Sequence, residues 1–375
     1  MDTYKVGKIE AICLIAIIML NHIILNLPKT LLISTGSSAI LNAIYVAFLI
    51  ILLIFIITKL WRHFPDKDIL DIGEFLGGKK LKIFLGILFF LFFLYISAIF
   101  LRSFTTTIKI IYFEYFPVSI LAILLLAGAY LVNKLGTKAV IRTNLLTVPI
   151  VAIAIFIVCI SGINKFTYQR IFPILGYGAE STFLSGISNI FAFSGIAILY
   201  FLPPMLEKKK DFKKISLISI TIVSILLILS VATLLFTFSF MTKTQELTSL
   251  YMEIRGNNYG SLFERADALF IFFWILAIIS YLSVTLLFLS HIFKKIIPIQ
   301  DKRGILLLLC NLVLACSLIP SNIAQIRFAE ITIIRYFSLI LLYGISIPIL
   351  ILANRKAKKK KGSIVYKKEE EIPDV

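Results

Sequence analysis

Ten long runs of apolar residues divide this chain, and they limit its possible folds more than any other feature. An α-helix rises about 1.5 Å per residue, so about 20 apolar residues cross the hydrocarbon layer of a bilayer. Because unpaired backbone groups are costly in lipid, such runs fold as membrane-spanning helices. The sequence therefore predicts an all-α integral membrane protein with ten transmembrane helices. The runs are 9–33, 38–58, 82–104, 117–133, 140–161, 183–205, 215–240, 267–291, 304–322 and 332–353.

The composition excludes several other classes of protein. Of the 375 residues, 59% are hydrophobic and 15% are charged, whereas soluble domains have about 45–50% and about 25%. The four cysteines (Cys13, Cys159, Cys310 and Cys316) all lie in apolar runs and lack ligand spacing, so we expect buried apolar side chains. No nucleotide-binding loop, zinc motif or catalytic triad is visible. We therefore expect no enzymatic activity, no cofactor and no metal.

The positive charges indicate an orientation. The chain has a net charge of +18, but its basic residues form short clusters between the runs, which argues against a nucleic-acid partner. Of the 38 Lys and Arg residues, 28 fall on the N-terminus, the alternate loops on the same side and the tail. The positive-inside rule then places both termini in the cytoplasm of a bacterial cell. We expect one transmembrane domain over 1–355, a charged cytoplasmic tail over 356–375, and a short interfacial helix within 61–80.

The first and sixth runs are interrupted at similar depths. The first contains Asn21, His22 and Asn26 before Pro28, and the sixth contains Ser194 and Gly195. At 1.5 Å per residue, these breaks lie roughly 16–18 Å into the membrane. Polar residues there are costly unless they face protein or a cavity, and Gly and Pro interrupt helices.

The two interrupted runs are five spans apart and cross the membrane in opposite directions. This pattern is typical of a five-plus-five inverted repeat, with repeat one at about 9–161 and repeat two at about 183–353. A substrate site is expected where the broken helices meet, because freed backbone groups there can bind an amino acid. The alternative is that the small residues serve close helix packing, which for Gly195 alone is the better interpretation.

Several side chains are candidates for this site, and each has a structural alternative. His22 is either a hydrogen-bonded histidine between helices or a proton relay, and we expect it to be the only titratable residue of the core. Tyr95 and Tyr281 are candidate pocket walls, or they form interhelical hydrogen bonds. The candidate ligand-binding residues are Asn21, His22, Asn26, Tyr95, Ser97, Phe191, Phe193, Ser194, Gly195 and Tyr281.

The order of several short motifs is similar to that in a known family. These motifs include Asn26-Leu27-Pro28, the loop from His63-Phe64-Pro65 to Gly77-Gly78, Phe172-Pro173-Ile174, and Phe193-Ser194-Gly195 followed by Leu202-Pro203-Pro204-Met205. In these motifs and in span count, the chain resembles the spore germination permeases, the B subunits of endospore germinant receptors. That family belongs with the amino acid–polyamine–organocation carriers, whose first span has a Gly-rich break where this chain has Asn21-His22.

The resemblance implies a LeuT-like fold with broken helices 1 and 6. It also implies a receptor subunit in the inner spore membrane that binds an amino acid or similar germinant and signals with A and C subunits. A second hypothesis is an amino-acid or organic-cation carrier, either ion-coupled or facilitative. A third is a scaffold or part of an ion pathway. The sequence does not name the ligand.

Overall fold

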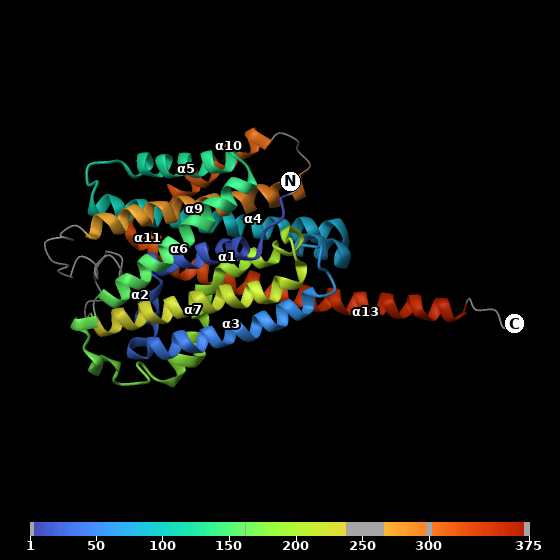
Figure 1. Ribbon diagram of the computed structural model, residues 1–375, viewed down its shortest axis with the longest axis horizontal. Coiled ribbons are helices and arrows are strands. Elements are labelled where there is room, and N and C mark those ends of the chain that lie inside the picture. Colours follow the sequence, from blue (N-terminus) through green and yellow to red (C-terminus); the bar gives the residue numbers. More distant parts are fainter. Residues whose placement is uncertain (1–3, 162, 238–265, 298–301, 371–375) are drawn as a thin grey trace.

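The computed structural model of this chain is almost entirely helical (Figure 1). It describes residues 4–161, 163–237, 266–297 and 302–370. In this part of the chain, eight helices are long and apolar enough to cross a membrane. Two shorter apolar helices, Val118–Lys134 and Gly304–Ser317, coincide with the fourth and ninth predicted runs. The prediction of an all-α membrane protein is confirmed, while the ten crossings and the inverted repeat stay predictions.

The helices are arranged side by side along one long axis, and the C-terminal helix extends beyond the bundle (Figure 1). The long elements of the first half are α1 (Lys8–Leu25), α2 (Leu27–Thr35), α3 (Ala39–Trp61), α4 (Ile69–Ile111), α5 (Val118–Lys134) and α6 (Thr137–Ser161). The second half contains η4 (Glu180–Leu184), η5 (Ser185–Tyr200), η6 (Pro203–Met205), η7 (Lys209–Asp211), α7 (Phe212–Thr237), α9 (Ala266–Ile296), α10 (Lys302–Ser317), α11 (Ile323–Phe328), η9 (Ala329–Ile333), α12 (Ile334–Ser338), η10 (Leu339–Ile345) and α13 (Ser346–Glu370).

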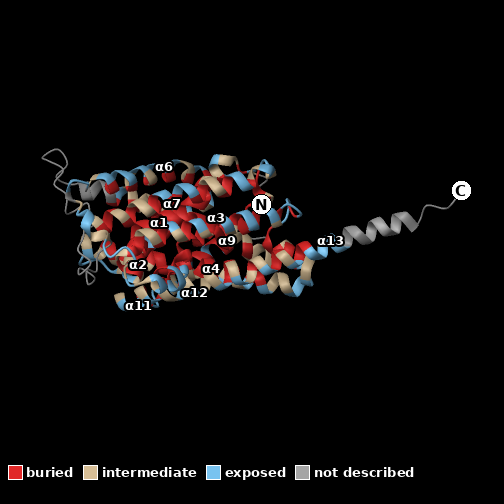
Figure 2. Ribbon diagram, turned by 90° about the horizontal axis from the view of Figure 1, so that it is seen from below, coloured by how far each residue is buried: buried red, intermediate tan, exposed pale blue. Residues whose placement is uncertain are grey.

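Helix α1 lies at the centre of the bundle. It packs against α6, α7, α9 and η5, and its residues from Cys13 to Leu25 are all buried. A helix that is apolar on every side is stable only when neighbours surround it. Figure 2 shows that buried residues are concentrated along the middle helices of the bundle. By contrast, peripheral helices expose large apolar side chains such as Phe48 (60% exposed) and Leu146 (70%), which suits contact with lipid.

Helix α4 begins with a short segment that a kink separates from its long apolar part. The backbone leaves helical geometry at Gly77 and at Gly78, where φ is 71°. A positive φ is unfavourable for residues with a Cβ, so glycine is the residue that suits this position. The segment before the kink matches the short helix predicted within 61–80. Lys356 of α13 donates hydrogen bonds to the carbonyls of Phe75 (2.9 Å) and Leu76 (3.0 Å) at this segment.

A buried ion-pair cluster fixes the start of α4 to the end of α9. Asp68 caps α4 by accepting from the amides of Leu70 and Asp71, both at 3.1 Å. Its other oxygen accepts from His291 Nε2 (3.0 Å) and Lys295 Nζ (2.6 Å). Burial alone would raise the pKa of Asp68, but the hydrogen bond from His291 and the charge of Lys295 together lower that pKa to about 2.

Candidate functional site

The first span is interrupted at Asn26. Helix α1 ends at Leu25, Asn26 has φ −135° and ψ −3°, and α2 begins at Leu27 with Pro28 in its first turn. Proline lacks an amide hydrogen, and its ring clashes with the carbonyl four residues earlier, so α1 cannot continue through Pro28. The prediction that the break lies at Asn21-His22 is wrong, because α1 is regular there. The interruption comes about one turn later.

The sixth span is irregular along its length, whereas the sequence predicts a single break at Ser194-Gly195. It starts with one π-helical turn, η4, and continues as the 3₁₀-type segment η5. The backbone of Phe193 (φ −100°, ψ 26°) leaves helical geometry directly before Ser194. Phe193 itself is fully buried at this kink.

Gly195 allows η5 to approach α1 closely. A Cβ at this position would lie 2.9 Å from the Met19 side chain and 3.0 Å from the Ile15 carbonyl oxygen. These distances are shorter than ordinary contacts, and the space around Gly195 is therefore filled by α1. Gly195 has the helix-packing role that the sequence left as its alternative.

His22 contacts residues of two other elements. Its ring stacks on Phe100 of α4, with centroids 4.2 Å apart and an interplanar angle of 19°. Its Nδ1 is 3.5 Å from the Ser194 hydroxyl of η5. Phe100 in turn packs 5.4 Å from the ring of Tyr281 on α9. Within the described residues, His22 Nε2 and the Tyr281 hydroxyl are buried without a hydrogen-bond partner.

Asn21 connects α1 to α9 one turn away from Tyr281. Its amide nitrogen donates to the carbonyls of Ile17 (2.9 Å) and Ala277 (3.2 Å). Its carbonyl oxygen is buried and, in the part of the chain described, has no hydrogen-bond partner. Most buried polar atoms in proteins are paired with protein or water. The unpaired atoms of Asn21, His22 and Tyr281 therefore leave hydrogen-bonding capacity unused in this part of the bundle.

A buried glutamate faces the interruption of the first span. Glu330 is 6% exposed and lies in the π-helical turn η9. Its Oε2 accepts hydrogen bonds from Asn26 Nδ2 (3.1 Å) and Ser103 Oγ (3.3 Å). The expectation that His22 is the only titratable residue of the core is wrong. The sequence places the last span at 332–353, so Glu330 falls just before it, whereas the structure carries the helical segment from Ile323 through to Lys359.

Two small cavities meet at Glu330. One has a volume of about 10 Å³ and is lined by His22, Thr30, Phe191 and Glu330, among others. The other, of about 20 Å³, is lined by Asn26, Ser103 and Arg327 on the far side of the carboxylate. Each holds about one water molecule. The site is closed in this conformation, and an amino acid enters only if the surrounding segments move apart.

Arg335 lies near the same aromatic wall. Its guanidinium is 5.0 Å from the centroid of the Phe191 ring, and it donates to Asn189 Oδ1 at 3.2 Å. Asn189 also donates to Asn42 Oδ1 (2.7 Å) and Ser34 Oγ (3.0 Å). This network ties α2, α3 and α12 to η5 beside the cavity.

The structure thus brings together six of the predicted site residues: Asn21, His22, Asn26, Phe191, Ser194 and Tyr281. Among the described residues, no hydrogen bond, ring contact or cavity joins Tyr95 or Ser97 to them. Tyr95 is half-buried, and Ser97 donates to the carbonyl of Phe93 (2.5 Å) in its own helix. Sequence reasoning missed Glu330, Phe100, Ser103 and Arg335.

Comparisons with known proteins agree with this architecture. A family model described as a spore germination protein matches residues 5–326. The spore germination protein YndE of Bacillus subtilis (strain 168) is 23% identical over 368 residues, which are 96% of this chain and 98% of that protein. The solved structure of a Na⁺-coupled sialic acid symporter in its substrate-bound outward-open state has a TM-score of 0.57 and 12% identity. The likeness covers 92% of this chain and 77% of the symporter, and it confirms the LeuT-like fold.

Proposed function

Because the chain belongs to the spore germination protein family, we propose that it is a nutrient germinant receptor subunit that binds a small germinant beside Glu330. The germinant is an amino acid or a similar molecule. The site lies between the interruption at Asn26, the kinked segment η5 and the π-helical turn η9. The buried carboxylate of Glu330 is the observation that carries the proposal.

A buried carboxylate needs a positive partner or several hydrogen bonds to offset its desolvation. On one side of Glu330, the second cavity contains Arg327. On the other side, the residues that line the first cavity include no Lys or Arg, and Phe191 offers an aromatic face there. A ligand ammonium fits this side because it pairs with the carboxylate and lies over the face of the ring.

The carboxylate of an amino acid then needs a donor close to the same ring. The guanidinium of Arg335 lies 5.0 Å from the centroid of that ring, and its Nε is buried without a partner within the described residues. We assign the ammonium to Glu330 and the ligand carboxylate to Arg335. The unpaired atoms of Asn21, His22 and Tyr281 supply further hydrogen bonds to a ligand that enters more deeply.

Ligand binding signals only if the ligand has different affinities for two conformations. The cavities here are too small for an amino acid, so an opened conformation binds more tightly than this closed one. Opening at α2, η5 and η9 also changes the outer surface of the bundle, which receptor A and C subunits would contact. We place the protein in the inner spore membrane with both termini in the cytoplasm, in agreement with the distribution of basic residues.

Germination of spores tests this function. The chromosomal copy is replaced by Glu330→Gln or, as a matched control, by Glu114→Gln at an exposed glutamate. We expect spores with Glu330→Gln to lose their response to an amino-acid panel at normal protein level, and control spores to germinate normally. A normal nutrient response of the Glu330→Gln spores would contradict the proposal.

A carrier is the second candidate, and the likeness to a Na⁺-coupled symporter favours it. The purified protein is reconstituted into liposomes, and a sodium or proton gradient is set up across their membrane. Radiolabelled amino acids are then added outside, and their uptake is measured. Accumulation that Glu330→Gln abolishes would support a carrier. A receptor that moves no solute gives no flux in this assay while it still binds the ligand.

A further inference from the structure

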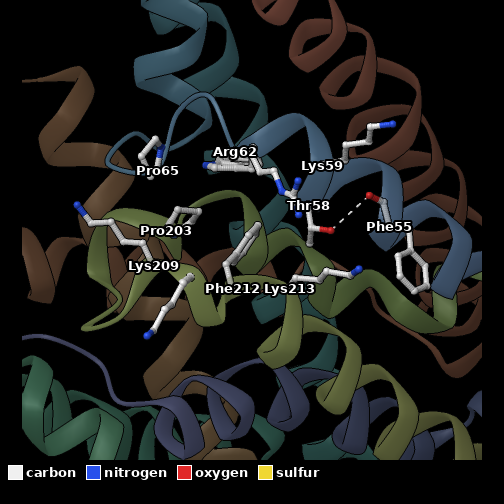
Figure 3. A pocket seen from close by; sticks show the side chains of 11 residues that line it. Phe55, Thr58, Lys59, Arg62, Pro65, Pro203, Lys209, Phe212 and Lys213 are labelled. Carbon is white, nitrogen blue, oxygen red and sulfur yellow. Dashed lines mark hydrogen bonds between the residues drawn. The ribbon is translucent and has the colours of Figure 1, made fainter.

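A third and larger cavity lies far from Glu330, at the end of the bundle that carries both termini. It has a volume of about 440 Å³ and lies between the end of α3 and the start of α7 (Figure 3). The parallel bridge between Val6 and Leu206 places the N-terminal segment at this same end. The cavity is large enough for a ligand of several heavy atoms, and neither the germinant site nor the resemblance assigns it a role.

Five basic side chains surround this cavity, and no Asp or Glu lines it. They are Lys59 and Arg62 at the end of α3, and Lys209, Lys210 and Lys213 around the start of α7. Lys209 forms an ion pair with Asp66, and Lys213 lies 4.4 Å from the centroid of the Phe55 ring. Within the described residues, Lys59, Arg62 and Lys210 have no carboxylate partner. Like charges gathered around one cavity repel each other unless an anion lies between them.

The inner wall of the cavity is rigid. Trp61 is 2% exposed, and its Nε1 donates to the carbonyl of Lys67 at 3.0 Å. Its ring packs 5.8 Å from Phe212. The hydroxyl of Thr58 donates to the carbonyls of Ile54 (2.8 Å) and Phe55 (3.3 Å), and Figure 3 shows the second of these bonds. The cavity is therefore preformed, and the basic side chains stand around a fixed wall.

One face of α3 connects the cavity to the apolar surface of the bundle. Arg62, Lys59 and Phe55 follow each other at helical spacing, and the same face continues as Leu52, Phe48 and Ile44. The apolar members are exposed, at 42% for Phe55, 44% for Leu52, 60% for Phe48 and 49% for Ile44. A small free anion makes no favourable contact with this apolar face, whereas the acyl chains of a lipid pack along it in a bilayer.

We propose that this cavity binds the headgroup of an anionic phospholipid, with the phosphate between Lys59, Arg62 and Lys210. The acyl chains lie along the apolar face of α3. Basic pockets between helices at the charged side of a membrane suit such headgroups. The lipid connects the end of α3 to the start of α7, which follows the irregular sixth span directly.

Lipid binding to the purified full-length protein tests this inference. The probes are phosphatidylglycerol and phosphatidylcholine with identical acyl chains, measured by native mass spectrometry in detergent. We expect the wild-type protein to bind phosphatidylglycerol about tenfold more tightly, and Lys59→Gln/Arg62→Gln/Lys210→Gln to lose about that factor. The control Lys79→Gln/Lys80→Gln/Lys358→Gln removes the same charge from exposed positions at the same end and keeps the preference.

All six positions are exposed, so both variants should fold, and a single symmetrical peak in gel filtration checks this. If the triple variant aggregates, Lys210→Gln is compared with Lys79→Gln in the same assay. Equal binding of the two lipids, or an unchanged preference in the cavity variant, would overturn the proposal. Displacement of the lipid by millimolar inorganic phosphate would also overturn it, since the cavity would then be a site for small anions.

Discussion

Glu330 combines a charged side chain with near-complete burial beside a helix break. Burial of a charged side chain in a membrane protein costs free energy, and intramembrane ionisable groups usually have a functional role. Its importance was not readable from the sequence. Arg327 and Gln325 precede it, and this polar stretch looks like the loop before the last span. Only the packing of η9 against Asn26 and Ser103 shows that its side chain points inward.

Asp68→Asn should destabilise the protein. The variant keeps a side-chain acceptor for the α4 amides but leaves His291 without its carboxylate and Lys295 with Asp71 alone. Removal of one partner from a buried ion pair costs about 3–5 kcal/mol. Thermal unfolding in detergent should show a clearly lower midpoint than for Asp66→Asn, whose carboxylate is exposed. Equal midpoints would mean that the cluster contributes nothing.

The carboxylate of Asp68 also makes the stability of the folded protein depend on pH. Because the folded pKa of Asp68 is about 2, below the usual value of about 3.9, the ionised group stabilises the folded protein above about pH 4. This contribution is lost as the pH falls from about 4 towards 2. The stability difference between wild type and Asp68→Asn, measured by thermal unfolding, should therefore shrink as the pH falls from about 4 towards 2. A difference that grows as the pH falls over this range would contradict the sign.

At the scale of single elements, the two interrupted spans were predicted with unequal accuracy. Ser194 and Gly195 indicated the kink of η5 to within one residue, at Phe193. In the first span, the polar pair Asn21-His22 suggested a break where α1 is regular. The actual break follows from Pro28, because a proline disrupts the helical hydrogen bonds and the backbone conformation of the turn that precedes it. Polar side chains indicate where a helix makes polar contacts, whereas proline indicates where its regular helical geometry ends.

Gly195→Ala tests the close approach of η5 and α1. The new methyl group would lie 2.9 Å from Met19 and 3.0 Å from the Ile15 carbonyl, and overpacking of this kind costs about 1–3 kcal/mol. We expect a lower unfolding midpoint, which Met19→Ala restores in part because it removes one of the two contacts. Ser194→Ala serves as the neighbouring control, and a midpoint for Gly195→Ala at or above that control would show that the helices can separate freely.

Gly78→Ala tests the kink in α4. A Cβ at Gly78 meets no atom within 4 Å, so the only cost is that of a positive φ, about 1–2 kcal/mol. The variant should unfold at a moderately lower temperature without any change in germinant response. An unchanged midpoint would show that the backbone relaxes to a negative φ.

At the scale of the whole molecule, the pattern of apolar runs was enough to predict a helical membrane bundle. It could not show which helices are neighbours, because packing partners depend on side-chain shape and not on hydropathy. The central position of α1 and the meeting of Asn26 with Glu330, 304 residues apart, are results of that packing. The site therefore became visible only in three dimensions, although most of its first-half residues were predicted.

Orientation is tested by cysteine labelling. Tyr115, 96% exposed, lies between α4 and α5, and Lys358 lies on α13 at the opposite end. With both termini in the cytoplasm, a membrane-impermeant maleimide should label Tyr115→Cys on intact protoplasts and Lys358→Cys only after permeabilisation. Of the four native cysteines, Cys13, Cys159 and Cys310 are buried and Cys316 is half-buried, so the unsubstituted protein gives the background. The reverse labelling pattern would invert the topology.

Equilibrium binding to the purified protein tests the germinant site most directly. A thermal-shift screen of the twenty standard amino acids selects the one that stabilises the protein most, and its radiolabelled form is then titrated. A charge-assisted hydrogen bond contributes about 1.5–3 kcal/mol, so Glu330→Gln should weaken binding about 10- to 100-fold, while Glu114→Gln binds as the wild type does. Equal affinity of the wild type and Glu330→Gln would contradict a germinant site at this carboxylate.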